Sequence, residues 1–335
     1  MERDGDATMT AQAAIRGQEV VTRFAPSPTG QLHLGHGYSA VLAHDFAVAY
    51  SGRFLLRIED IDGTRSRPGH VETILADLAW LGLAHAPPVF QSARLNLYAD
   101  ALERLKVAGL VYPCFCTRAE IAAASLSAPH GVEAVYPGTC RGIAAPDLAR
   151  PHCWRLDVAK ALDSFFPGEG RGPVAPSPVG EDITLSQGTS ILSRGLRRGG
   201  GGHPMELSWH DASAGWIQAD PLAHGDVILA RKDAPASYHL AVTVDDAAQG
   251  VTDVVRGMDL FRATDVHRLL QTLLGLPSPR YHHHPLLTGA DGERLAKRHG
   301  SPTLAALREA GEDGRSVARA LRLGILPTGF AVAAP

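Results

Sequence analysis

Hydrophobic positions in the first 110 residues follow two periodicities. Short apolar runs that are typical of strands occur at residues 20–24 and 54–60. Apolar residues recur with helical spacing at 36–50, 68–82 and 94–109. Because strands that alternate with helices form parallel sheets, this pattern predicts an α/β fold with a parallel sheet.

The alternation of predicted strands and helices resumes at residue 226. Segments rich in β-branched residues at 226–233, 237–247 and 251–257 predict strands, and 259–275 predicts a helix that ends near Gly275. We therefore expect a split α/β domain with halves at 19–110 and 226–280 and an inserted subdomain at 111–225. Residues 281–335 then form a C-terminal region, in which 303–324 predicts two short helices.

Composition places the chain among globular proteins. The 335 residues are 45% hydrophobic and 20% charged, and a net charge of −3 neither indicates nor excludes a nucleic-acid partner. Apolar stretches stay well short of the roughly 18 residues that a membrane helix needs, and the N-terminus lacks a signal pattern. We expect a cytoplasmic protein without a membrane segment. Two segments are predicted without regular structure, a disordered tail at 1–18 and a mobile Gly- and Pro-rich loop at 167–204.

The loop at 25–37, APSPTGQLHLGHG, carries the first chemical signal. A strand that leads through a Gly-rich turn to a helix N-terminus offers free backbone N–H groups and the positive end of a helix dipole, which suit a phosphate group. His33 and His36 lie at this turn and can donate hydrogen bonds to phosphate oxygens in a transition state. The loop is neither a Walker A motif nor a GxGxxG dinucleotide motif.

Four segments in order resemble one known family. RFAPSPTGQLHLGH resembles the "HIGH" region of class I aminoacyl-tRNA synthetases of the glutamyl and glutaminyl branch, and the other three segments are LLRIEDID (55–62), SYHLAVTVDDAAQGVTDVVRGMDL (237–260) and RLAKRHG (294–300). The resemblance implies a Rossmann-like catalytic domain with an inserted subdomain. It also implies an ATP-dependent ligase that activates glutamate to glutamyl adenylate without needing tRNA.

Length discriminates within that branch. Only 37 residues follow Arg298, so we expect no anticodon-binding domain. The chain therefore most resembles the truncated paralogues, the glutamyl-queuosine tRNA(Asp) synthetases, which attach glutamate to queuosine in the anticodon of tRNA(Asp). The resemblance implies ATP, L-glutamate and queuosine-bearing tRNA(Asp) as partners, and we expect a monomer.

The resemblance also assigns a glutamate site. Its residues would be Arg23, Phe24, Ala25, Pro26, Ser27, Glu59, Tyr238 and Arg256. Arg23 and Arg256 suit the two carboxylates because a guanidinium can form a bidentate fork with each, and Glu59 suits the ammonium group. Tyr238 would add a hydrogen bond to the substrate.

ATP binding is assigned to His33, Gly35, His36 and Lys297, with Mg²⁺ on the phosphates. The catalytic residues would be His33, His36 and Lys297, the last of these in a "KMSKS"-like loop at 294–298. Ala296 stands where the family often has Ser, which weakens one hydrogen bond by about 0.5–1.5 kcal/mol but leaves Lys297 in place.

The cysteines indicate a structural zinc site. Cys114, Cys116 and Cys140 have a spacing that could hold Zn²⁺ with one more ligand. In the resembling paralogues the fourth ligand is a tyrosine, here Tyr136, and His130 is the conventional alternative. Cys153 stands apart and is expected to be an ordinary buried thiol.

Two further motifs are not assigned to a site. His282, His283 and His284 are consecutive in an extended segment, so their side chains alternate between faces and cannot all bind one ion. Arg194, Arg197 and Arg198 could contact RNA phosphates, although a solvated linker explains them more simply.

Three rival functions remain open at this point. A truncated tRNA(Glu) charger would place glutamate on a 3′ ribose, and a catalytically silent synthetase-derived binding protein would release no pyrophosphate. A small-molecule adenylylating ligase would share the HxGH chemistry but would not need Arg23, Glu59 and Arg256.

Overall fold

A computed structural model of the chain describes residues 19–117, 119–121, 135–165, 207–289, 302–326 and 330–333. The predicted tail at 1–18 and the predicted loop at 167–204 lie outside these residues. His130, Lys297, Ala296 and the arginines at 194, 197 and 198 also lie outside them.

Two sets of strands meet to form the central sheet. The first set is β1 (Val21–Phe24), β2 (Arg53–Ile58) and β3 (Val89–Phe90), all parallel. The second set has the order β7 (Gly215–Gln218), β6 (Ser208–Asp211), β10 (Arg280–His284) and β9 (Asp253–Gly257), of which only β7 is antiparallel to its neighbour. The sets join at β1 and β9, because the Thr252 amide donates to the Val21 carbonyl at 3.0 Å and the Val21 amide donates to Thr252 Oγ1 at 2.8 Å.

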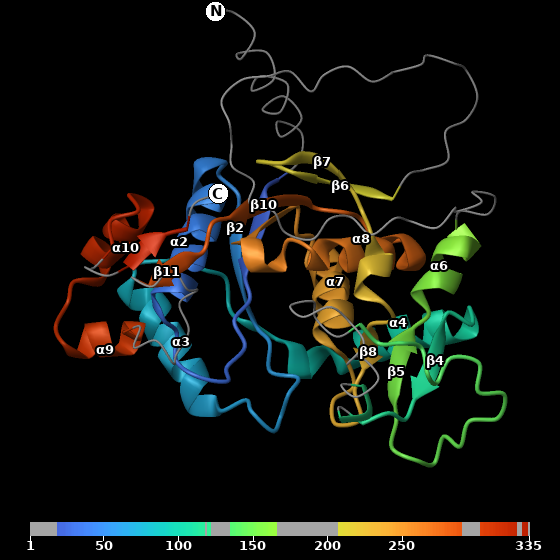
Figure 1. Ribbon diagram of the computed structural model, residues 1–335. Coiled ribbons are helices and arrows are strands. Elements are labelled where there is room, and N and C mark those ends of the chain that lie inside the picture. The colour runs from blue at the N-terminus through green and yellow to red at the C-terminus, as the bar shows by residue number, and fades with distance from the viewer. Residues whose placement is uncertain are drawn as a thin grey trace, which may run out of the picture.

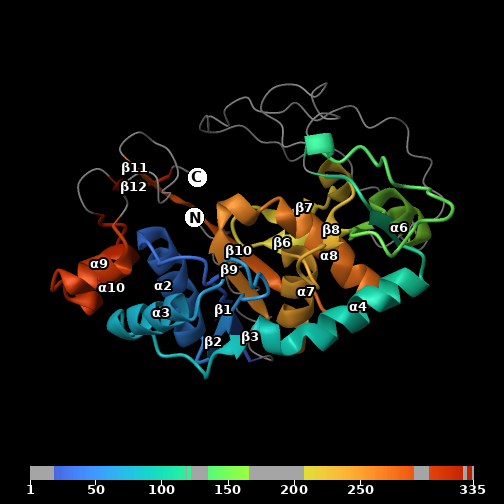
Figure 2. The same cartoon turned by 90° about the horizontal axis from the view of Figure 1, so that it is seen from below.

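Helices cover both faces of this sheet. In Figure 2, α2 (Leu34–Ala49) and α3 (Pro68–Trp80) lie on one side of the strands, and α4 (Leu95–Val107), α7 (Tyr238–Ala248) and α8 (Ala263–Leu274) lie on the other. Alternate strand residues face opposite sides. Phe54, Leu56 and Ile58 therefore join the core under α2, whereas Leu55 joins the core under α7 and α8.

Smaller elements extend the molecule at both ends. Figure 1 places the region of β4 (Val111–Cys114), β5 (Cys153–Leu156) and α6 (Val158–Phe165) opposite α9 (Leu304–Glu309) and α10 (Gly314–Arg322). The strand β8 (Ile228–Ala230) completes an antiparallel sheet with β4 and β5, and β11 (Leu287–Gly289) pairs with β12 (Phe330–Val332). The described residues also include three short 3₁₀ helices, η1 (Gln91–Arg94), η2 (Pro221–His224) and η3 (Met258–Leu260).

Most predicted elements are confirmed, including the two short helices within 303–324 and the left-handed Gly275 that ends α8. The predicted strand at 237–247 is wrong, because these residues form α7. Val242, Thr243 and Val244 favour strands intrinsically, but every residue from Leu240 to Asp246 is buried between neighbouring elements, and this packing overrides local propensity. The Thr243 hydroxyl is satisfied within the helix by donating to the His239 carbonyl.

Among the described residues, no helix has both the length and the apolar character that crossing a membrane would require.

Candidate active site

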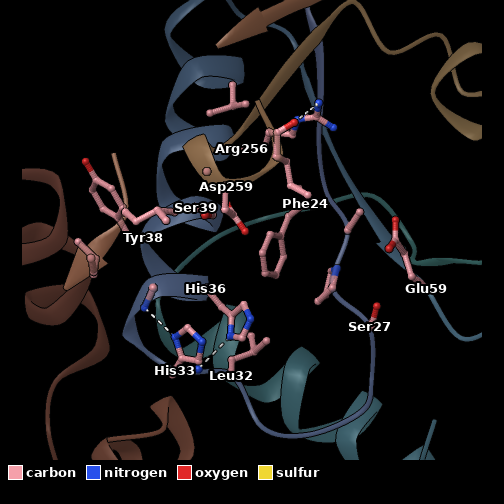
Figure 3. A pocket seen from close by; sticks show the side chains of 18 of the residues that line it. Phe24, Ser27, Leu32, His33, His36, Tyr38, Ser39, Glu59, Arg256 and Asp259 are labelled. Atoms are coloured by element: carbon pink, nitrogen blue, oxygen red, sulfur yellow. Dashed lines mark hydrogen bonds between the residues drawn. The ribbon is translucent and has the colours of Figure 1, made fainter. Parts of the chain in front are cut away.

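A cavity of about 530 Å³ lies at the carboxyl ends of β1 and β9. From β1 the chain passes through α2 to β2 on one side, and from β9 it passes through α8 to β10 on the other side. Ligands of open α/β sheets bind at such a switch point, outside the carboxyl ends of the strands. Figure 3 shows His33 and His36 at one end of this cavity and Arg256 at the other.

His33 and His36 form a capping box at the N-terminus of α2. The Gly35 amide donates to His33 Nδ1 at 3.1 Å, and the His33 amide donates to His36 Nδ1 at 3.2 Å. Because each Nδ1 accepts a hydrogen bond, the proton of each neutral ring lies on Nε2. A Cβ at Gly35 would lie 3.0 Å from the His33 ring, so any larger residue here would have to displace the ring by a few tenths of an ångström.

Arg256 is buried at the end of β9 among neutral partners. Its Nε donates to His283 Nε2 at 3.1 Å, and its Nη2 donates to Thr264 Oγ1 at 2.7 Å. Tyr238 Oη and His267 Nδ1 each lie 3.4 Å from Arg256 Nη1. Burial and the nearby guanidinium lower the pKa of His267 well below its usual range, which keeps that ring neutral. Among the described residues no carboxylate oxygen lies within 4.0 Å of this guanidinium.

Arg23, in contrast, belongs to a buried ionic network. Its Nε donates to Asp246 Oδ1 at 3.1 Å, and the same oxygen accepts a hydrogen bond from Arg57 Nη1 at 2.7 Å. Burial alone would raise the pKa of Asp246, but Arg23 and Arg57 outweigh burial and hold it below its usual value. Asp245, next in sequence, joins the network through its Oδ2, which lies 3.7 Å from Arg57 Nε, and it also accepts hydrogen bonds from Arg94, Gln91 and Tyr98.

Glu59 borders the cavity beside this network. Its Oε1 accepts no hydrogen bond within the described part of the chain and lies 3.6 Å from Arg57 Nη2. Burial raises the pKa of Glu59 to about 7, against the opposing effect of Arg57 and Arg23. Glu59 therefore has a buried acceptor atom that a donor from a ligand could satisfy.

The cavity brings together most of the predicted site residues. Its lining includes Arg23, Phe24, Ala25, Pro26, Ser27, His33, Gly35, His36, Glu59, Tyr238 and Arg256, and Lys297 lies outside the described residues. Sequence reasoning missed Arg57 and Asp246, which hold the arginine and glutamate side chains of the site. The two consecutive acids at 245–246 within an apolar segment were a usable signal, because buried carboxylates require partners.

A second site lies in the thiol cluster of Cys114, Cys116 and Cys140. Their sulfurs lie within 4.8 Å of one another, and the Tyr136 hydroxyl lies 3.3 Å from Cys114 Sγ and 3.6 Å from Cys116 Sγ. Burial raises the pKa of Cys114, but hydrogen bonds from Tyr136 and Arg155 outweigh it and lower this pKa to about 7. Three thiols gathered in this way could hold a metal ion.

Cys153 is buried, as predicted, and is not part of this group. Its thiol donates to the Cys114 carbonyl across the β4–β5 pair.

Comparison with known proteins connects this geometry to one family. A family model described as the catalytic domain of class I tRNA synthetases (E and Q) matches residues 19–136 and 202–330. The chain is 44% identical to the glutamyl-Q tRNA(Asp) synthetase of Rhodobacter capsulatus over 312 residues, which cover 91% of this chain and 100% of that protein. It is 43% identical to the glutamyl-Q tRNA(Asp) synthetase of Deinococcus radiodurans, over 88% of this chain and 84% of that one.

Among solved structures, a glutamate tRNA ligase from Elizabethkingia meningosepticum in complex with its amino acid matches with a TM-score of 0.66 and 23% identity. The match covers 92% of this chain and 61% of that chain, so our chain spans about three fifths of its length. At this identity the likeness shows the shared fold alone.

Proposed function

The chain belongs to the class I glutamyl- and glutaminyl-tRNA synthetase family, and on this premise we propose that it is the ligase that activates glutamate with ATP and transfers it to queuosine in the anticodon of tRNA(Asp). The observation that carries the proposal is a single cavity that joins the capped N-terminus of α2 to Arg23, Glu59, Tyr238 and Arg256. The names of the relatives support the queuosine acceptor.

Glutamate binding follows from charge. Arg256 has neutral partners, so its charge is available to a substrate carboxylate, and Arg23 adds a second guanidinium on the neighbouring strand. Glu59 has an unsatisfied buried oxygen for the ammonium group. These complementary groups would select an amino acid with an acidic side chain.

The first step joins glutamate to ATP. An oxygen of the α-carboxylate, already ionised at neutral pH, attacks the α-phosphorus, and the bond to the β-phosphate breaks with release of pyrophosphate. No general base is required, so the protein's contribution is positioning and stabilisation of charge. His33 and His36 carry Nε2 protons that can donate to phosphate oxygens, and Lys297 would add a cation. ATP would bring Mg²⁺, which neutralises phosphate charge.

The second step transfers glutamate to RNA. A hydroxyl oxygen of the queuosine cyclopentenediol attacks the carbonyl carbon of the adenylate and forms an ester. AMP leaves, and the hydroxyl proton is released.

We also propose that the thiol cluster holds one structural Zn²⁺. Three cysteine sulfurs and the Tyr136 hydroxyl lie close enough together to supply four ligands, and thiolates are preferred zinc ligands. The metal would tie β4 to the loop that carries Cys140. We expect Tyr136→Phe to bind less zinc per chain than Cys153→Ser, whose thiol lies outside the group. Full zinc content in Tyr136→Phe would favour His130 as the fourth ligand.

The decisive experiment incubates the protein with ATP, labelled glutamate and tRNA(Asp) with or without queuosine. We expect label on queuosine-bearing RNA only, and glutamate-dependent pyrophosphate exchange without any tRNA. Label on the 3′ end of tRNA(Glu) would identify a tRNA(Glu) charger instead, and an absence of pyrophosphate release would identify a silent binding protein. Cytoplasmic location and a monomeric state stay predictions, which fractionation and light scattering test.

A further inference from the structure

The three consecutive histidines of β10 have separate partners. His282 Nε2 lies 2.9 Å from Asp253 Oδ1, and His283 Nδ1 lies 2.8 Å from Asp211 Oδ2. His284 Nε2 lies 2.9 Å from the Ser39 hydroxyl at the cavity wall. The middle histidine is the one that reaches Arg256.

Asp211 determines which nitrogen of His283 carries the proton. The backbone amides of Ser213 and Ala214 donate to Asp211 Oδ1, and the His283 amide donates to Oδ2. Burial opposes ionisation of this carboxyl, but His283 and these amides outweigh it and lower the pKa of Asp211. Because an ionised carboxylate can only accept, His283 Nδ1 must donate to it.

His283 Nε2 is consequently a lone-pair acceptor. It accepts a hydrogen bond from Arg256 Nε at 3.1 Å. The two hydrogen bonds therefore point the same way, because Arg256 donates to His283 and His283 donates to Asp211. Burial and the nearby Arg256 lower the pKa of His283 to about 4, so the ring is neutral at physiological pH. The side chains of Asp211 and His283 are both fully buried, which isolates the relay from solvent.

We propose that His283 is a positioning residue for Arg256, with its tautomer set by Asp211, and that this relay orients the guanidinium for a substrate carboxylate without neutralising it. The proposal rests on the proposed function, in which Arg256 binds glutamate. A carboxylate in direct contact would orient Arg256 equally well but would compete with the substrate for its charge. Because the His283 imidazole lies between Asp211 and Arg256, it orients the guanidinium while the carboxylate stays out of direct contact with it.

Kinetics test the role of His283. We expect His283→Ala to raise the KM for glutamate by about tenfold, the scale of one hydrogen bond to a charged group, and to leave the KM for ATP unchanged. His283→Gln should restore much of this loss, because its amide oxygen can accept from Arg256 Nε. The matched control is His282→Gln, which changes the adjacent histidine on the other face of the strand and should leave both KM values unchanged. A wild-type KM for glutamate in a folded His283→Ala protein would overturn the proposal.

Imidazole ¹⁵N NMR tests the tautomer independently of activity. We expect His283 to carry its proton on Nδ1 in the ligand-free protein. In Asp211→Asn the two backbone amides should hold the amide oxygen on their side and turn its NH₂ toward His283, which moves the ring proton to Nε2 and removes the acceptor for Arg256. A wild-type ring protonated on Nε2 would overturn the relay. If the wild-type protein showed no glutamate-dependent exchange, the proposed function would fail while the tautomer remained measurable.

Discussion

Arg23 and Arg256 lie on neighbouring strands at one cavity, but opposite kinds of partner hold them. Arg23 shares Asp246 with a second buried arginine, Arg57, in a network that also includes Glu59. Arg256 is held by two neutral imidazoles, a phenol and a threonine hydroxyl. We call Arg23 with its carboxylate partners the ionic wall of the site, and Arg256 with its uncharged direct partners the neutral wall.

This difference separates stability from ligand binding. A buried ion pair orients its members, and its loss leaves an uncompensated charge, but a paired cation has less charge to offer a ligand. A buried cation among neutral groups keeps its charge for a ligand, at the cost of desolvation. We infer that the ionic wall mainly holds the two halves of the fold together and that the neutral wall mainly binds substrate.

Asp246→Asn should give the largest effect, on folding. It removes the carboxylate that Arg23 and Arg57 share, and a buried charge left without its partner typically costs about 3–5 kcal/mol. Urea unfolding followed by circular dichroism would measure this loss. Arg256→Met, which leaves no buried charge behind, serves as the comparison and should lose less. Equal losses in the two variants would show that the two walls do not differ.

Arg256→Met should give the next largest effect, on activity. Removing one partner of a buried charged contact typically costs about 2–5 kcal/mol, so glutamate-dependent pyrophosphate exchange should fall by roughly 30-fold or more. The KM for ATP should stay close to wild type. Arg23→Met should lose less exchange activity per folded molecule, because its charge is already shared. The reverse order would assign the substrate carboxylate to the ionic wall.

The smallest effect is a pH dependence of glutamate binding. Glu59 has a pKa raised to about 7 and must be ionised to bind an ammonium group, so the KM for glutamate should rise as pH falls below 7, by at most about tenfold per pH unit. Arg57, Arg23, Asp245 and Asp246 all face this carboxyl and set its pKa. Glu59→Gln should bind weakly with a flat profile between pH 5.5 and 8.

The same pKa has a consequence for folding with a definite sign. Between the ordinary glutamate pKa of about 4.5 and the raised value of about 7, the folded chain binds more protons than the unfolded chain. The contribution of Glu59 to the free energy of unfolding therefore decreases as pH rises through this window. Wild-type protein should lose more stability across it than Glu59→Gln, which lacks the titrating group.

The sequence predicted the parts of the site whose chemistry is local. The strands at 20–24 and 54–60 and the helix N-terminus beside His33 and His36 depend on a few adjacent residues, and the structure contains all three. It did not predict α7, because burial on all sides of residues 240–246 depends on elements distant in the chain. The relay from Asp211 to Arg256 was also beyond prediction, since it needs the parallel register of β6, β10 and β9. The three consecutive histidines could be recognised in the sequence, but their hydrogen-bond partners could not be predicted from it.

The junction between β1 and β9 has a consequence for biosynthesis. The hydrogen bonds that join Val21 to Thr252 connect positions 231 residues apart. At roughly 5–20 residues per second, a ribosome exposes the first strand on the order of ten seconds or more before its neighbour emerges. Until then the cavity does not exist, so glutamate cannot help the nascent N-terminal half to fold. Ligand supply can protect only the finished protein against unfolding and proteolysis, by mass action.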